Sequence, residues 1–253
     1  MISEPFANKK TWVHSLDPRL RVCTAFFLSC LFAITNQPVL AACALIASAL
    51  LLGCSRPPLS ALLRRLAGVN LFILFLWCSV PFFTPGTPIA KFGPLTCTQE
   101  GLDLVWLVTL KANAITLLLI ACIGTMSASL LGHALQALRL PDKFVYLLLF
   151  TYRSLFVLAD EWQRLQTALR LRGFVAGTNL HTYRTVGYLF GLTLTRSLDR
   201  AQRIHQAMLL RGFTGRFPAF VLLRFQRHDF LFAILTALFL IFLLFFWNNP
   251  FFP

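Results

Sequence analysis

The sequence predicts an all-α integral membrane protein with about five transmembrane helices, within a range of about four to six. Of the 253 residues, 57% are hydrophobic and 14% are aromatic, which is too apolar for an ordinary soluble domain. Asp, Glu, Lys and Arg are absent from four long windows, namely 22–55, 66–90, 112–138 and 230–253. Because about 20 apolar residues cross a bilayer core as a helix, each window can hold at least one span.

The first window is long enough for two spans, and Asn36-Gln37-Pro38 at its centre predicts the turn between them. The residues before the first apolar run are charged and no small-residue cleavage site follows it, so the first span is expected to stay in the protein. The external segment 84–103 contains several Pro and Gly residues and is expected to be irregular. The expected spans lie near 20–36, 38–54, 66–83, 105–131 and 229–247.

The net charge is +14, and the basic residues are unevenly distributed. If the N-terminus is cytoplasmic, the cytoplasmic segments 1–21, 55–65 and 132–228 hold 21 of the 23 Lys and Arg, and only Lys91 and Lys111 lie elsewhere. Since Lys and Arg concentrate on the cytoplasmic side, this distribution predicts a multi-pass protein of the bacterial plasma (inner) membrane with its N-terminus inside. The Lys111 side chain is expected to reach the external interface.

Three regions are expected: residues 1–131 with four spans, a cytoplasmic region at 132–228, and a last span within 229–253. The middle region is predicted to form long amphipathic helices, with a start at Pro141-Asp142 and stops at Gly173 and Gly212.

Two apolar runs in that region, Phe144–Phe150 and Val186–Leu194, are too short to span a membrane alone. They suit helices in the interface or packed beneath the spans, and a sixth, shorter span stays open. Attraction of the basic region to anionic lipid is expected, at about 1 kcal/mol per Lys or Arg. Nucleic acid is not an expected partner, because no binding motif accompanies the basic residues.

Few residues suit catalysis or metal binding. The seven Cys lie mostly within spans without a Cys-x-x-Cys pair, and the five His have no ligand spacing, so no metal site and no catalytic residue is predicted. A membrane-embedded transferase would need a cluster of carboxylates such as Asp-x-x-Asp at the membrane face. The sequence has no such cluster among its inner-face acids, Asp142, Asp160, Glu161, Asp199 and Asp229.

The same helix ending occurs twice, as RLQTALRLRGF at 164–174 and RIHQAMLLRGF at 203–213. When Asp160–Phe174 is aligned without gaps on Asp199–Phe213, eight of the fifteen positions are identical. This is a repeat of a helix end rather than of a domain.

Each copy predicts a rigid helix tip with a guanidinium at its end. Arg172 follows Ala168 by four residues, so both lie on one helical face, and Arg211 stands in the same relation to Ala207. A Gly after the Arg can adopt the left-handed conformation that ends a helix. An Arg is also favourable at any helix C-terminus, by about 0.3–1 kcal/mol, but two copies suggest two equivalent binding partners.

The repeated Ala-x-x-x-Arg-Gly-Phe pattern, its extension RGFTGRF at 211–217 and the LDPRLRV segment at 16–22 resemble the T component of energy-coupling factor transporters. The resemblance covers about residues 12–247 and is greatest to the cobalt/nickel branch, the CbiQ/NikQ proteins. Many members have Ala before the first Arg, whereas this chain has Leu171 there and Leu210 in the second copy.

The resemblance implies a non-catalytic membrane scaffold with long cytoplasmic coupling helices. Its partners would be two ABC-type ATPase subunits and a separate substrate-binding membrane subunit of the S or M type. The implied ATPase-coupling residues are Ala168, Leu171, Arg172, Gly173 and Phe174 in the first copy, and Ala207, Leu210, Arg211, Gly212 and Phe213 in the second.

The sequence contains no Gly-x-x-x-x-Gly-Lys-Ser/Thr phosphate loop, so this chain is expected to bind no cofactor, and ATP with Mg²⁺ is expected on the ATPase subunits. Uptake of cobalt or nickel ions is the implied function. A vitamin transporter of the same kind is the alternative, followed by a conventional ABC permease or a membrane-embedded transferase.

Overall fold

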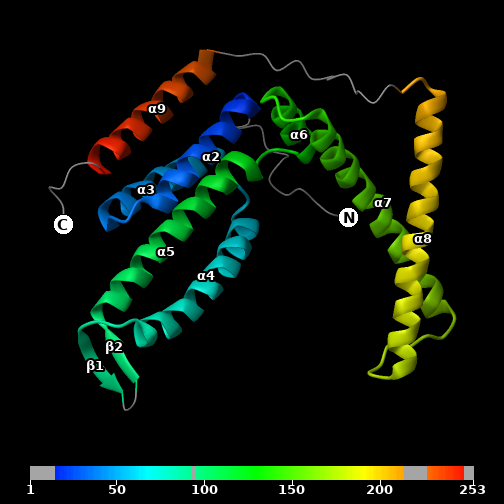
Figure 1. Cartoon of the computed structure of the whole chain (residues 1–253), viewed down its shortest axis with the longest axis horizontal. Coiled ribbons are helices and arrows are strands. Elements are labelled where there is room, and N and C mark those ends of the chain that lie inside the picture. Colours follow the sequence, from blue (N-terminus) through cyan, green and yellow to red (C-terminus); the bar gives the residue numbers. More distant parts are fainter. Residues whose placement is uncertain (1–14, 93–94, 214–226, 248–253) are drawn as a thin grey trace. The chain divides into compact units, whose positions relative to one another are not determined.

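The computed structural model describes residues 15–92, 95–213 and 227–247 (Figure 1). These residues are almost entirely helical, as the sequence predicts. The helices are α2 (Pro18–Ile34), α3 (Pro38–Ser55), α4 (Leu59–Phe83), α5 (Gln99–Leu119), the π-helical turn η1 (Ile120–Gly124), α6 (Ala128–Ala137), α7 (Asp142–Leu171), α8 (Leu180–Leu210) and α9 (Arg227–Trp247).

The chain divides into two compact units. One, here named the membrane unit, comprises residues 4–138 and 222–253, and the other comprises residues 1–3 and 139–221. Within the second, the helices α7 and α8 are here named the helix pair. The expected region boundaries after residues 131 and 228 each lie seven residues from the observed divisions, which fall after Leu138 and Val221.

Within residues 15–92, 95–213 and 227–247, four helices are long and apolar enough to cross a membrane: α3, α4, α5 with η1, and α9. The first expected span, near 20–36, corresponds to α2, which has 17 residues and lies at the short end of the roughly 17–25 residues that cross a bilayer. These apolar helices are those of a multi-pass membrane protein.

The expected fourth span at 105–131 is wrong at both ends. The helix begins at Gln99, passes into the π-helical turn and ends at Gly124. Ser127 then starts a separate helix, because its Oγ accepts a hydrogen bond from the Leu130 amide at 3.3 Å as an N-cap. The break was not predicted, because the window 112–138 was defined by the absence of charge and a capping serine carries none.

The external segment is not irregular throughout. Strands β1 (Pro88–Phe92) and β2 (Leu95–Thr98) pair antiparallel between α4 and α5 (Figure 1). Both strands contain residues with high β-propensity, among them Ile89 and Thr96, which outweigh the Pro and Gly that predicted a loop.

Local signals explain where the first two helices begin. The Asp17 side chain accepts a hydrogen bond from the Arg19 amide at 2.9 Å, and Pro18 occupies the first helical position of α2. Pro38 occupies the same position in α3, so Asn36 and Gln37 form the predicted turn.

The core of the membrane unit lies where α5 packs against α2, α3 and α4 (Figure 1). Three alanines, Ala25, Ala44 and Ala114, are at most 2% exposed in it. Small residues let transmembrane helices approach closely and gain van der Waals contact. All seven cysteines are free, and Cys122 is buried in this core.

Polar groups are buried where α2 begins. The Asp17 amide donates to Oδ1 of Asp229 at the start of α9 (2.7 Å), and the Arg21 guanidinium donates to Oγ1 of Thr125 just after η1. All four residues are at most 4% exposed. We name them the polar clamp, because they join three segments that are distant in sequence.

Lys111 of α5 donates from Nζ to the Ala33 carbonyl (3.1 Å) and to Oδ1 of Asn36 (3.2 Å). The ammonium group therefore lies at the C-terminal end of α2, where carbonyl groups have no helical partner.

Candidate functional site: two matching helix tips

The first copy of the repeat ends α7. The Gly173 amide donates to the Arg170 carbonyl (3.0 Å) and the Phe174 amide to the Leu169 carbonyl (3.1 Å). Gly173 has a φ of 79°, in the left-handed region. These features define a Schellman motif, which satisfies the last carbonyls of a helix and ends it after Arg172.

The second copy ends α8 in the same conformation. The Gly212 amide donates to the Leu209 carbonyl (3.0 Å), the Phe213 amide donates to the Met208 carbonyl (3.0 Å), and the φ of Gly212 is 76°. The predicted stops at Gly173 and Gly212 are therefore confirmed. The two tips share one backbone geometry as well as one sequence.

Both tips present the same side chains to solvent. Leu171 is 85% exposed and Leu210 is 91% exposed. Arg172 and Arg211 are exposed in both copies, and within the described residues neither guanidinium makes a hydrogen bond or ion pair. Ala168 and Ala207 are exposed as well, whereas Phe174 and Phe213 are half-buried.

The two tips lie at opposite ends of the helix pair, because α7 and α8 run in opposite directions (Figure 1). α8 has 31 residues and is therefore about 46 Å long. The fold does not bring the two groups of predicted coupling residues together. It places them where two separate partner surfaces can reach them.

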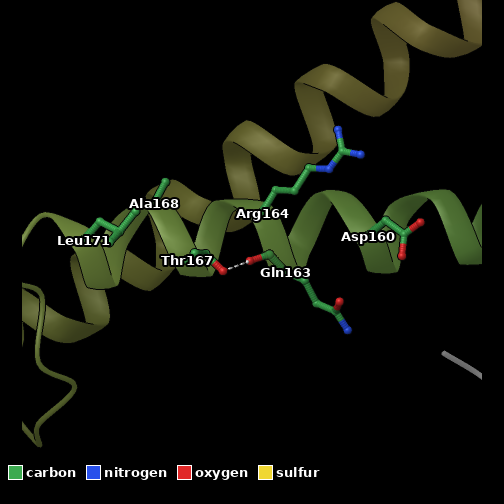
Figure 2. Close-up of a pocket in the computed structure, with 6 residues that line it drawn as sticks. All are labelled: Asp160, Gln163, Arg164, Thr167, Ala168 and Leu171. Carbon is green, nitrogen blue, oxygen red and sulfur yellow. Dashed lines mark hydrogen bonds between the residues drawn. The ribbon is translucent and has the colours of Figure 1, made fainter.

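The surface next to each tip is hollowed. Asp160, Gln163, Arg164, Thr167, Ala168 and Leu171 line a pocket of about 560 Å³ along the last turns of α7. Figure 2 shows these six side chains on successive turns, with the Thr167 hydroxyl bonded to the Gln163 carbonyl at 2.9 Å. A groove of about 450 Å³ between α7 and α8 is lined in part by Ala207 and Arg211.

One ion pair joins the helices of the pair where they cross. Arg196 of α8 binds Glu161 of α7, and the Trp162 and Phe190 rings lie beside it with centroids 4.8 Å apart. The hydrogen bond from Arg196 holds the pKa of the Glu161 carboxyl below its ordinary value. These contacts join α7 to α8 between the two tips.

Sequence reasoning missed the residues that support the site. Glu161 and Arg196 are 35 residues apart, and no local spacing joins them. The polar clamp was missed for the same reason, although Asp17 and Arg21 belong to the LDPRLRV segment that carried the family resemblance. Charged residues at the start of an apolar helix were the available signal.

Two of the acidic residues considered for catalysis, Asp229 and Glu161, have structural partners. Asp229 accepts from the Asp17 amide, and Glu161 is paired with Arg196. Over residues 15–92, 95–213 and 227–247, no group of three His, Cys, Asp or Glu residues is arranged to hold a metal ion. The extension at 214–217 and the C-terminal residues 248–253 lie outside the described residues.

Comparison with known proteins gives a consistent result. The family model CbiQ, described as cobalt transport protein, matches residues 9–219. The chain is 26% identical to the energy-coupling factor transporter transmembrane protein EcfT of Leuconostoc gelidum, over 82% of each chain. It is 28% identical to the nickel permease LarQ of Lactiplantibacillus plantarum, over 98% of this chain and 84% of LarQ. Cobalt transport protein CbiQ of Rhodobacter capsulatus is 33% identical over 36% of each chain.

Proposed function

We propose that this chain, which belongs to the CbiQ family of cobalt transport proteins, is the membrane coupling subunit of an energy-coupling factor importer. In this role it transmits movement from a pair of ABC-type ATPase subunits to a separate substrate-binding membrane subunit. The chain itself is not an enzyme, and ATP with Mg²⁺ is bound and hydrolysed by its partners.

One observation carries the proposal: the same Arg-Gly-Phe tip is built twice, at opposite ends of one helix pair. An ATPase pair offers two equivalent sockets, and a single coupling subunit needs two equivalent tips to engage both. The exposed guanidinium suits such a socket, because its planar fork pairs with carboxylates and carbonyls. The coupling residues are the ten that the two copies of the motif supply.

The contacts between α7 and α8 support a role in transmitting movement from the ATPase subunits. The Glu161–Arg196 ion pair and the Trp162–Phe190 contact join α7 to α8 near the crossing. A displacement of either tip by an ATPase subunit therefore moves both helices together. The uneven distribution of Lys and Arg supports a cytoplasmic N-terminus and cytoplasmic tips in a plasma (inner) membrane, with anionic lipid near the basic helices.

The substrate of the importer is a cobalt or nickel ion. The family description and the names of the CbiQ and LarQ relatives support this assignment. The EcfT relatives carry no metal in their names, so a vitamin is the alternative substrate. Metal content of cells that produce the complete transporter, compared with cells lacking this chain, distinguishes the two.

The decisive experiment is purification of the tagged chain after co-production with the ABC-type ATPase subunits of its own organism. We expect one copy of this chain for two ATPase subunits, and loss of the ATPase from the double variant Arg172→Ala/Arg211→Ala. A ratio of two to two would identify a conventional ABC permease instead. Retention of both the ATPase and ATP-dependent uptake by the double variant would contradict the assigned residues.

A further inference from the structure

The residues that are identical in the two copies are not spread evenly around the helix. Six of the eight identical positions precede the glycine, and at about 100° per residue all six fall within one half of the helical circumference. Five of the seven differing positions fall on the other half. The identical pairs are Asp160/Asp199, Gln163/Gln202, Arg164/Arg203, Ala168/Ala207, Leu171/Leu210 and Arg172/Arg211.

Within this half, here named the identical half, all twelve residues at the identical positions are exposed. On the other half, Leu165 of α7 is buried and Ile204 of α8 is half-buried, although His205 and Leu209 of α8 are exposed. Packing within the helix pair therefore constrains some of the differing positions and places little constraint on the identical ones. Exposed positions usually tolerate substitution within about 0.5 kcal/mol, so folding alone does not explain the identity there.

We infer that each partner contact extends beyond the tip, along about three helical turns, to Asp160 in the first copy and Asp199 in the second. This inference rests on the proposed function and adds to it the residues Asp160, Gln163, Arg164, Asp199, Gln202 and Arg203. Figure 2 shows this surface on α7, where Asp160, Gln163 and Arg164 line the pocket together with Ala168 and Leu171.

The side chains of the identical half indicate which groups the partner surface must present. Each socket on the ATPase carries an acidic group for Arg164 or Arg203, a basic group for Asp160 or Asp199, and an apolar hollow for the following leucine. An acid and a base four residues apart also fix the direction in which the helix lies in the socket. The partner must present this arrangement twice, as a symmetric pair of like subunits does.

The two sockets are distinguished at the edge of this surface. Glu161 corresponds to Arg200, so the charge reverses between the copies at one position on the identical half. Both side chains line the groove between the helices, and Glu161 is paired with Arg196. Two identical ATPase subunits must accept either charge at this position, whereas two homologous subunits can each match one of the two charges.

Photo-crosslinking in the complete complex tests the inference. Gln163 and Gln202 are replaced, one at a time, by a photoreactive phenylalanine analogue in the chain co-produced with its ATPase subunits. The matched controls are Gln166 and His205, which lie three residues further along, on the other half of each helix. We expect adducts with the ATPase from positions 163 and 202 at least about tenfold more often than from 166 and 205.

A charge-matched pair of variants provides a second measurement. Arg164→Ala/Arg203→Ala removes two exposed arginines from the identical half, and Arg170→Ala/Arg184→Ala removes two exposed arginines outside it. We expect the first variant to retain at least about tenfold less ATPase and the second to match the wild type. Equal retention by both variants, with equal crosslinking at all four positions, would overturn the inference.

The two levels of the proposal fail separately. The same photoreactive analogue is also placed at Leu171 and Leu210. If these two positions crosslink to the ATPase but positions 163 and 202 do not, the tips are the coupling site and the extended contact is wrong. If no position crosslinks and the wild-type chain retains no ATPase, the proposed function itself is wrong.

Discussion

Arginine has opposite surroundings in the membrane unit and in the helix pair. Arg21 is 1% exposed and its guanidinium donates to Thr125 within the polar clamp. Arg172 and Arg211 are exposed, and each follows the last residue of a helix. In the membrane unit the chain supplies a partner for its buried cation, and in the helix pair it leaves two cations available for another molecule.

The difference separates residues that hold the fold from residues that contact partners. Burying a charged group without a hydrogen bond is costly, so a buried arginine must be matched by the fold around it. An exposed arginine at a helix end gains only about 0.3–1 kcal/mol from the helix dipole. We therefore expect the first kind of arginine to control stability and the second kind to control assembly.

The largest expected effect is on folding, at the polar clamp. Arg21→Ala removes the donor to Thr125 and leaves a cavity, and we expect a loss of about 3 kcal/mol in the free energy of unfolding. Thermal unfolding of the purified chain in detergent measures it, with Arg21→Lys expected between the two. Arg172→Ala is the control and should unfold at the wild-type temperature. An unchanged unfolding temperature for Arg21→Ala would show that the clamp does not stabilise the unit.

The next effect is on assembly, with no change in folding. Arg172→Ala and Arg211→Ala, made singly, should each weaken ATPase binding by about 2 kcal/mol, or roughly thirtyfold. Equal backbone geometry at the two tips predicts effects of equal size. Binding of the purified chain to immobilised ATPase subunits gives both values, and a large effect at only one tip would show that the copies are not equivalent.

Glycines within the helix pair should respond with opposite sign. Gly173→Ala introduces a side chain at a φ of 79°, where no atom lies within 4 Å of the new Cβ, so the cost is backbone strain of about 1–2 kcal/mol. Gly187→Ala, inside α8 and equally free of close atoms, should stabilise its helix by up to about 1 kcal/mol.

Hydrogen–deuterium exchange measures both changes locally. Exchange should become faster in peptides ending at Phe174 for Gly173→Ala and slower in peptides around residue 187 for Gly187→Ala. Faster exchange in both variants would indicate that Gly187 has a packing role that the geometry does not reveal.

The smallest expected effect concerns the ion pair at the helix crossing. The pKa of Glu161 is lowered from 4.5 by its hydrogen bond with Arg196. The pair therefore contributes fully above the ordinary pKa, and its contribution is lost as the pH falls through the lowered value. Unfolding temperatures of the wild type and Glu161→Gln should differ slightly at neutral pH and converge in acid. A difference that persists at a pH below the lowered pKa of Glu161 would exclude the ion pair as its cause.

Several parts of the molecule followed from local sequence. The turn at Asn36-Gln37 and the stops at Gly173 and Gly212 depend on residues within one or two turns of each other. The β1–β2 hairpin and the break at Ser127 were missed, because Pro, Gly and an uncharged apolar window dominated the signal in those segments.

The sequence by itself determined the membrane character, the long helices and the existence of two matching tips, since apolar windows and a repeated motif are linear properties of a chain. Only the tertiary structure decided that Asp17 meets Asp229 and Arg21 meets Thr125, and that the residues shared by the two copies before each glycine are all exposed. The physical reason is that burial and exposure depend on which helices pack together, and the contacts that decide this join residues far apart in the chain.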